Sequence, residues 1–152
     1  MWLAIFPLSY LIHFAEEYWG GEGYPAYLLR LRGVHLSTRR FIVLQAAGFA
    51  LLIAAGLVSS LLRFPEFMLA ILGAVVLSNG ISHSVTAWRD GRYGPGLVVS
   101  TLFWIPLGAV TLFLMLGRLS NGRLAVGAMI GFAINGAVAL ITMRGGRLAR
   151  QT

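Results

Sequence analysis

Long apolar runs, separated by short polar segments, dominate the chain. They cover residues 41–62, 67–88, 97–117 and 124–143. An α-helix rises about 1.5 Å per residue, so about 20 apolar residues cross the hydrocarbon layer of a membrane. The pattern therefore predicts four transmembrane helices.

The first 15 residues are also apolar, but Pro7 interrupts them and Glu16 and Glu17 follow directly. They lack the positive start and the small-residue cleavage site of a signal peptide. We expect a further helix over about residues 2–19, whose last turns hold polar side chains inside the protein. The predicted fold class is all-α: a single-domain integral membrane bundle, residues 1–152, of about five transmembrane helices.

A polar linker, residues 20–38, joins the first helix to the next. Within it, residues 25–36 mix leucines with Arg30 and Arg32. This mixture fits a short helix lying in the membrane interface, and it equally fits a plain polar loop with some apolar side chains.

Composition supports a membrane protein. The chain is 58% hydrophobic and 11% charged, whereas soluble domains are about 45–50% apolar and about 25% charged. A soluble enzyme and a disordered chain are excluded. There is no cysteine and no lysine, which excludes thiolate metal sites and Schiff-base chemistry. The net charge of +7 fits anionic lipid headgroups better than nucleic acid. Arginine in place of lysine suggests a GC-rich bacterial genome, and the predicted location is a bacterial cytoplasmic membrane.

The distribution of arginines predicts the orientation, because cytoplasmic loops carry an excess of positive charge. With five spans, the termini lie on opposite sides of the membrane. A cytoplasmic C-terminus and an outside N-terminus place nine arginines inside: Arg30, Arg32, Arg39, Arg40, Arg89, Arg92, Arg144, Arg147 and Arg150. Three lie outside: Arg63, Arg118 and Arg123.

Several ionisable or amide side chains fall inside the predicted spans, where they are costly and usually functional. His13, Glu16 and Glu17 are spaced by three and four residues, so both carboxylates lie within one helical turn of the imidazole. Asn79 and His83 are likewise four residues apart. In the predicted topology both groups lie near the cytoplasmic ends of their helices, at a similar depth.

Two imidazoles and a carboxylate are a common ligand set for a catalytic zinc or iron ion. We expect a divalent metal held by His13, His83 and one or both of Glu16 and Glu17. The second glutamate is also a candidate general base. Asn79 would orient a ligand or polarise a substrate carbonyl. A plainer interpretation is that the two glutamates pair with arginines at the headgroups.

Two further side chains are candidates for the same site. Tyr93 follows His83 in a loop rich in glycine and would lean over the site as a hydrogen-bond donor, or would belong to an interfacial aromatic belt. His35 would complete a two-metal site, or would be a surface residue beside Arg32 and Arg39.

Three motifs in order resemble the HXXEE family of small membrane proteins. They are His13-Phe-Ala-Glu16-Glu17, Asn79-Gly-Ile-Ser-His83 and Tyr93-Gly-Pro95-Gly96. The resemblance covers roughly residues 5–115. It implies a helical membrane protein whose polar residues, including a second histidine, form a site, and it implies no particular activity, substrate or cofactor.

The first functional hypothesis is a metal-dependent enzyme that acts on a lipid or other apolar substrate at the cytoplasmic leaflet, with hydrolysis favoured over iron-dependent oxidation. A second is a non-catalytic binding or assembly protein, for example one with haem between His13 and His83. A third is an ion-coupled or proton-coupled transporter, which would need polar groups along the whole membrane depth.

Packing of the last span is predicted from Gly127 and Gly131, which form a GxxxG pattern. Such small residues let helices approach closely, either within the chain or in a homodimer. Pro7 and Pro106 predict irregularities in their helices.

Overall fold

The computed structural model describes residues 2–148, with side chains as far as Arg144. Arg150 and the Arg147 side chain, both counted in the predicted topology, lie outside that part. The elements are α1 (Ile5–Trp19), α2 (Tyr24–Arg32), α3 (Thr38–Leu61), α4 (Pro65–Asp90), α5 (Leu97–Val99), a π-helical turn (Ser100–Trp104), α6 (Ile105–Leu116) and α7 (Asn121–Leu148). A 3₁₀ turn, Trp2–Ala4, precedes α1. No strand occurs among the described residues, which confirms the all-α class.

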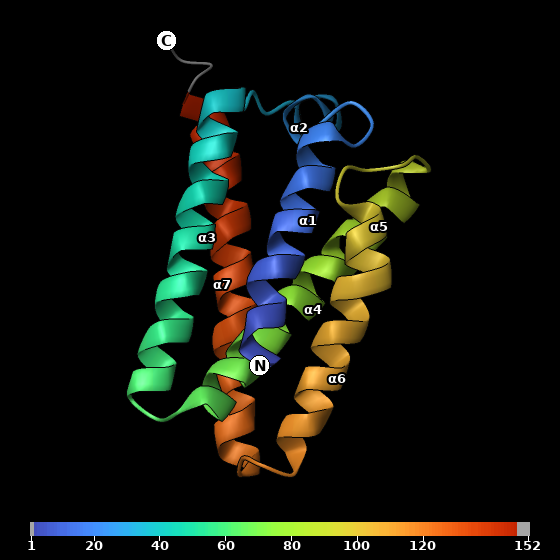
Figure 1. The fold of residues 1–152 in the computed structure, drawn as a ribbon. Helices are drawn as coiled ribbons and strands as arrows, with labels where there is room; N and C mark the ends of the chain where they lie inside the picture. Colours follow the sequence, from blue (N-terminus) through green and yellow to red (C-terminus); the bar gives the residue numbers. More distant parts are fainter. Residues whose placement is uncertain (1, 149–152) are drawn as a thin grey trace.

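Four helical segments are long and apolar enough to cross a membrane, and each coincides with a predicted span. They are Thr38–Leu61, Pro65–Asp90, Leu97–Leu116 and Asn121–Arg144. Helix α1 has 15 residues, fewer than the roughly 20 that a perpendicular span needs. It lies alongside the longer helices (Figure 1), and its role as a fifth span remains a prediction, as does the orientation of the termini.

Apolar side chains face outward on most sides of α3, as expected for a helix in lipid. Leu51 is 70% exposed and Leu61 is 80% exposed. A helix that is hydrophobic on all sides belongs in a core or a membrane. Lipid contact therefore accounts for the pattern of α3.

Helix ends follow from local chemistry. Ser37 caps α3, and its hydroxyl accepts a hydrogen bond from the Arg40 backbone N–H at 3.3 Å. Helix α4 starts with Pro65, whose missing N–H is not needed at that position. It ends at Gly91, which takes the left-handed conformation common at helix C-termini.

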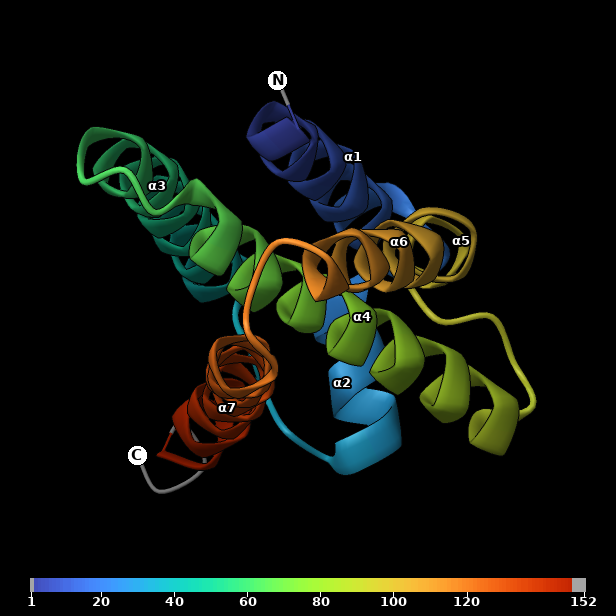
Figure 2. The same cartoon turned by 90° about the horizontal axis from the view of Figure 1, so that it is seen from below.

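Helix α4 is the centre of the bundle, with α7 on one side and α6 on the other (Figure 2). Glycines allow both close approaches. A Cβ added at Gly131 would lie 2.7 Å from the Cβ of Ala74, and one added at Gly108 would lie 2.7 Å from the Cβ of Leu77. Gly127 likewise faces Ala70. The GxxxG pattern of α7 thus packs within the chain, the first of the two interpretations given above.

The irregularity predicted around Pro106 is a π-helical turn that directly precedes it. The N–H of Ile105 donates to the carbonyl of Ser100, five residues earlier. Such turns insert one extra residue and rotate the side chains that follow. Here Trp104 points into the bundle and is only 3% exposed. Pro7 lies in the first turn of α1, where a missing N–H costs little.

The linker between α1 and α3 contains a helix, α2, rather than a plain polar loop. Its Leu28 is buried together with Val34 and Leu36 from the following segment, and all three pack near Phe41 at the start of α3. Helix α2, the start of α3 and the end of α7 gather at one end of the bundle (Figure 1). The candidate site lies toward this end.

Candidate metal centre

Two polar residues on one face of helix α1 point into the protein. His13 and Glu17 are four residues apart, and they are 3% and 4% exposed. One helical turn separates them, so their side chains lie one above the other. His83 of α4 faces the same point, and its side chain is 14% exposed.

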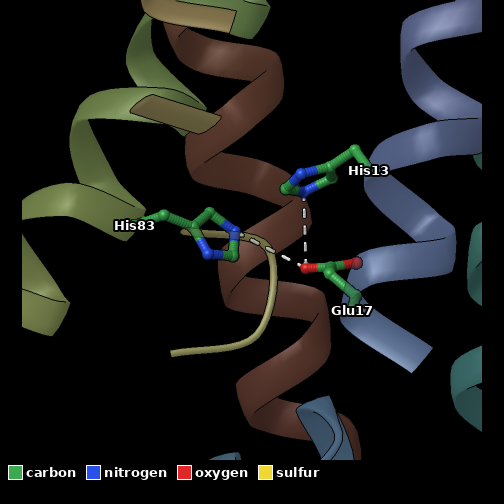
Figure 3. Close-up of side chains that lie close together, drawn as sticks. All are labelled: His13, Glu17 and His83. Carbon is green, nitrogen blue, oxygen red and sulfur yellow. Dashed lines mark ion pairs between the residues drawn. The ribbon is translucent and has the colours of Figure 1, made fainter. Parts of the chain in front are cut away.

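One carboxylate oxygen joins the three side chains (Figure 3). Glu17 Oε1 lies 3.6 Å from His13 Nε2 and 3.5 Å from His83 Nε2. The two imidazole rings meet edge to face, with centroids 5.0 Å apart. Each residue offers one ligand atom, and these three atoms lie within 4.8 Å of one another. The structure therefore brings the two predicted histidines together with one of the two predicted glutamates.

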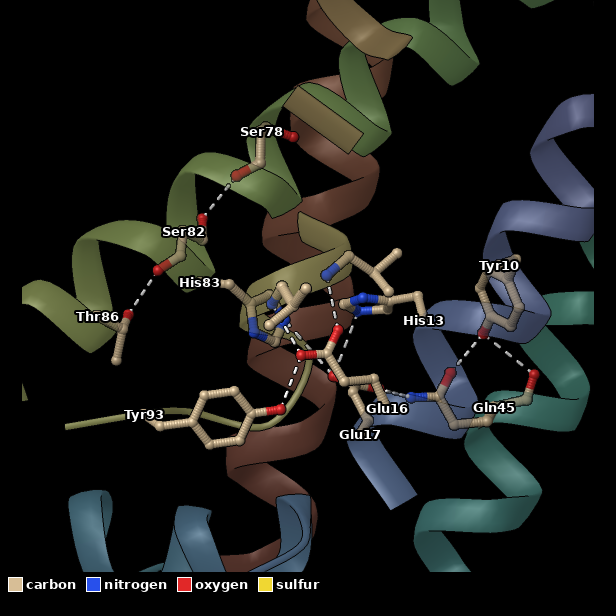
Figure 4. A network of polar contacts seen from close by, with 12 residues as sticks. Tyr10, His13, Glu16, Glu17, Gln45, Ser78, Ser82, His83, Thr86 and Tyr93 are labelled. Atoms are coloured by element: carbon tan, nitrogen blue, oxygen red, sulfur yellow. Dashed lines mark hydrogen bonds and ion pairs between the residues drawn. The ribbon is translucent and has the colours of Figure 1, made fainter. Parts of the chain in front are cut away.

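A second layer of hydrogen bonds holds the Glu17 carboxylate in place (Figure 4). The side-chain amide of Gln45, on α3, donates to Glu17 Oε2. The Tyr10 hydroxyl donates in turn to the side-chain oxygen of Gln45 at 2.6 Å. Gly48 lies against that hydroxyl, because a Cβ there would come within 2.6 Å of it. Gln45 was not predicted as a site residue, although it is the one amide in its apolar run.

The loop before α5 covers the three side chains. Gly96 has φ +84°, and a Cβ added there would lie 2.7 Å from His13 Cε1 and 3.1 Å from both His83 Cε1 and Glu17 Cγ. Only glycine combines this backbone conformation with so close an approach. The carbonyl of the neighbouring Pro95 accepts a hydrogen bond from the His83 ring. The sequence motif 93–96 contains Gly96, but its part in the site shows only in three dimensions.

Aromatic rings form the remaining walls. Trp104 stacks on His13 with ring centroids 3.8 Å apart, and its indole N–H donates to the Ser9 hydroxyl at 3.2 Å. The Tyr24 ring of α2 lies 6.3 Å from the His83 ring. Burial raises the pKa of the Tyr24 phenol, and the nearby Glu17 charge raises it further. Tyr24 therefore stays neutral and contributes an apolar wall.

Glu16 lies outside the group of three and anchors the loop that covers it (Figure 4). Its carboxylate accepts hydrogen bonds from the backbone N–H groups of Val98 at 2.8 Å and Val99 at 2.7 Å, and from the Tyr93 hydroxyl at 2.8 Å. The two N–H groups belong to the free first turn of α5, where a carboxylate is favoured. Of the predicted ligands and catalytic groups, Glu16 and Tyr93 thus share this contact instead of facing the histidines.

The remaining predicted residues are separate from the three ligand atoms. Asn79 lies one turn before His83 on α4, and its Oδ1 is buried without a hydrogen-bond partner. His35 lines a cavity of about 500 Å³ with Tyr18, Glu22 and other residues around α2. It is not part of the cluster of possible ligands found among the described residues.

The chain matches a known protein family. The model of a family described as proteins of unknown function with an HXXEE motif matches residues 4–111. These residues include every side chain of the group of three, its second layer and its cover. No curated protein and no solved structure shows significant similarity to the chain.

Proposed function

The chain belongs to the HXXEE family, and we propose that it is a membrane-embedded metal-dependent enzyme. In this proposal His13, Glu17 and His83 hold a divalent zinc or iron ion. The substrate is a lipid or other apolar molecule at the cytoplasmic leaflet of a bacterial membrane.

The observation that carries the proposal is the spacing of the three ligand atoms. The two N···O separations of 3.6 Å and 3.5 Å are longer than good hydrogen bonds. Ligands held about 2.0–2.1 Å from one tetrahedral ion stand about 3.3 Å apart. Both N···O separations are therefore closer to the spacing of ligands around one metal ion than to the length of direct hydrogen bonds.

The charge balance of the site also favours a cation. Glu17 is buried, and within the described part of the chain its ion pairs are with the two histidines alone. By contrast, Glu22 and Asp90 both pair with Arg30. A buried carboxylate without a full positive partner is costly. A divalent ion would supply that charge, and the hydrogen bond from Gln45 would orient the carboxylate toward it.

Three protein ligands from two histidines and a carboxylate leave a coordination position open, which is typical of catalytic sites. A metal bound there would polarise a substrate oxygen or acidify a bound water, the chemistry of hydrolysis. The same ligand set also suits iron-dependent oxidation, which is our second choice of reaction. Glu17 would act as a ligand, while Glu16 would keep the cover in place.

The surroundings support an apolar substrate. Trp104 and Tyr24 line the site, and His83 is its most exposed ligand. A substrate would approach between helices along the His83 side of the group. A haem between His13 and His83 does not suit this geometry, because Glu17 contacts both rings and the rings meet edge to face, not across a planar macrocycle.

Elemental analysis of purified protein tests the metal. Wild-type protein from metal-replete cells should carry about one zinc or iron ion per chain. His83→Ala should carry almost none. His35→Ala is the matched control, because it removes a histidine outside the group and should leave the metal content unchanged. Equal metal content in all three proteins, or metal-free wild type, would refute the site.

Lipid analysis tests the enzymatic part separately. Membrane lipids from cells that express wild type, His83→Ala or His35→Ala would be compared by mass spectrometry. A product present with wild type and His35→Ala but absent with His83→Ala supports catalysis. Identical lipids, together with a loaded metal site, would favour a non-catalytic metal-binding role.

A further inference from the structure

Three buried polar atoms, one of them on His13, lack a hydrogen-bond partner in the described part of the chain. They are His13 Nδ1, Asn79 Oδ1 and Ser100 Oγ. His13 is 3% exposed and Ser100 is fully buried. Buried polar atoms are nearly always hydrogen-bonded, so each such exception needs an explanation.

The three atoms come from three elements that meet at the His13 ring. Asn79 lies one turn before His83, whose ring is 5.0 Å from the His13 ring. Its neighbour Gly80 packs against the π-helical turn, because a Cβ there would lie 3.0 Å from the Ser100 carbonyl oxygen.

Ser100 approaches the same ring from the other side. It follows Gly96 by one turn, and its N–H donates to the Gly96 carbonyl at 3.0 Å. Trp104 lies a further turn along. Gly96 and Trp104 both touch the His13 ring. Because Ser100 is four residues from each of them, helical periodicity puts it on the same face, toward His13.

We propose that His13 Nδ1, Asn79 Oδ1 and Ser100 Oγ bind one buried water molecule, through which Asn79 and Ser100 position His13. A buried water makes about three hydrogen bonds to groups that would otherwise be unpaired. The Asn79 oxygen accepts, the Ser100 hydroxyl donates or accepts, and Nδ1 does either, depending on where the ring proton lies. A water molecule matches every combination.

The positioning role rests on the proposed function. When His13 Nε2 binds a metal, the ring proton resides on Nδ1, which must then donate to an acceptor. The water accepts that hydrogen bond and donates to Asn79. Without a metal, a ring proton on Nε2 would face Glu17, and the water would then donate to Nδ1 instead. The water site itself is therefore expected in both states.

Zinc affinity and density for the water provide the test. We would titrate zinc against a competing chelator in wild type, Asn79→Leu, Ser100→Ala and the control Asn121→Leu, an exposed asparagine at the start of α7. Loss of a partner behind a metal-binding histidine weakens affinity by about 10–100-fold. Asn79→Leu should show a loss in this range, Ser100→Ala a loss in the same direction, and Asn121→Leu none. The unfolding temperature of the metal-free proteins should stay close to wild type.

A structure at a resolution that shows ordered water should contain a peak within hydrogen-bond distance of His13 Nδ1 and Asn79 Oδ1, and Asn79→Leu should lose it. If Asn79→Leu fails to fold, Ser100→Ala provides both measurements. Wild type without that peak overturns the inference, and unchanged zinc affinity in both site variants overturns the positioning role. If wild type binds no zinc, the proposed function fails, and the peak alone then decides whether the water site exists.

Discussion

Gly96 offers the sharpest test of how the cover and the ligands fit together, and we predict that Gly96→Ala damages both stability and metal binding. The residue combines φ +84° with contacts to all three candidate ligands. Adding one methyl group therefore perturbs the backbone and the site at once.

The magnitude has two parts. A non-glycine residue in the left-handed region costs about 1–2 kcal/mol. The new Cβ would also lie 2.7 Å from His13 Cε1 and 3.1 Å from His83 Cε1, closer than carbon atoms pack. Overpacking of this kind costs about 1–3 kcal/mol. The sum predicts a loss of about 2–5 kcal/mol in the free energy of unfolding.

Gly91→Ala separates the two parts. Gly91 also has a positive φ, +65°, but a Cβ there would meet no atom within 4 Å. This variant should lose only the backbone term, about 1–2 kcal/mol, and it should keep its zinc affinity.

The assay is equilibrium unfolding in detergent, paired with zinc titration of the three proteins. Gly96→Ala should be less stable than Gly91→Ala by about 1–3 kcal/mol and should bind zinc more weakly, because the histidine rings must move. Equal stability and equal zinc affinity in the two variants would show that the loop does not press on the ligands.

The remaining predictions concern the hydrogen bonds of Glu16 to Tyr93 and α5, and the packing of α7 against α4. Glu16→Gln should lower the free energy of unfolding by about 1–2 kcal/mol, the usual value of a helix cap, while Glu17→Gln should abolish zinc binding; loss of zinc from the first variant alone would contradict this division. Burial and the hydrogen bond to Glu16 raise the pKa of the Tyr93 phenol to about 12. The stability contributed by the hydrogen bond from Tyr93 to Glu16 is therefore full below about pH 10 and is lost as the pH rises through about 12. The difference between the phenolate absorbance titrations of wild type and Tyr93→Phe should show a tyrosine with this raised pKa, and a pKa near 10 would refute the prediction. Gly131→Leu should lose about 1–3 kcal/mol or more through overpacking against α4, whereas Gly136→Leu, in open space, should not; equal stability would argue against the internal contact.

Much of the fold could be predicted from the sequence, because the length and hydrophobicity of a segment are enough to identify a transmembrane helix. The four longest apolar runs become four helices within a few residues of the predicted bounds. The first helix does not meet the same length criterion, because α1 has only 15 residues. The linker helix α2 could not be separated from a loop by composition, since its leucines and arginines suit both.

The site was predictable where helical periodicity alone decides it. Spacing of four residues places His13 and Glu17 on one face, and similar depth brings His83 to them. The choice between Glu16 and Glu17 was not predictable, because each lies within one turn of His13. It depends on where α5 begins, since the free N–H groups of Val98 and Val99 hold Glu16.

The contributions of Gln45 and Trp104 depend on tertiary geometry that the sequence pattern does not show. Gln45 reaches Glu17 only because α3 packs beside α1. Trp104 reaches His13 because the π-helical turn rotates the chain just before Pro106. Pro106 in an apolar run predicted an irregular helix. It did not predict that the irregularity would be a π-helical turn, or that Trp104 would point inward.

Glu16 and Glu17 have different roles because they are adjacent on one helix. Successive residues on an α-helix point about 100° apart, so Glu17 faces the histidines while Glu16 faces the start of α5. Glu16 fixes that start, and Gly96, the residue directly before α5, presses on His13 and His83. If Glu16 lost its hydrogen bonds to α5, Gly96, two residues before Val98, would be free to shift, and its contacts with His13 and His83 would change. This coupling explains why a buried site in a small bundle would use two glutamates side by side where one would suffice as a ligand.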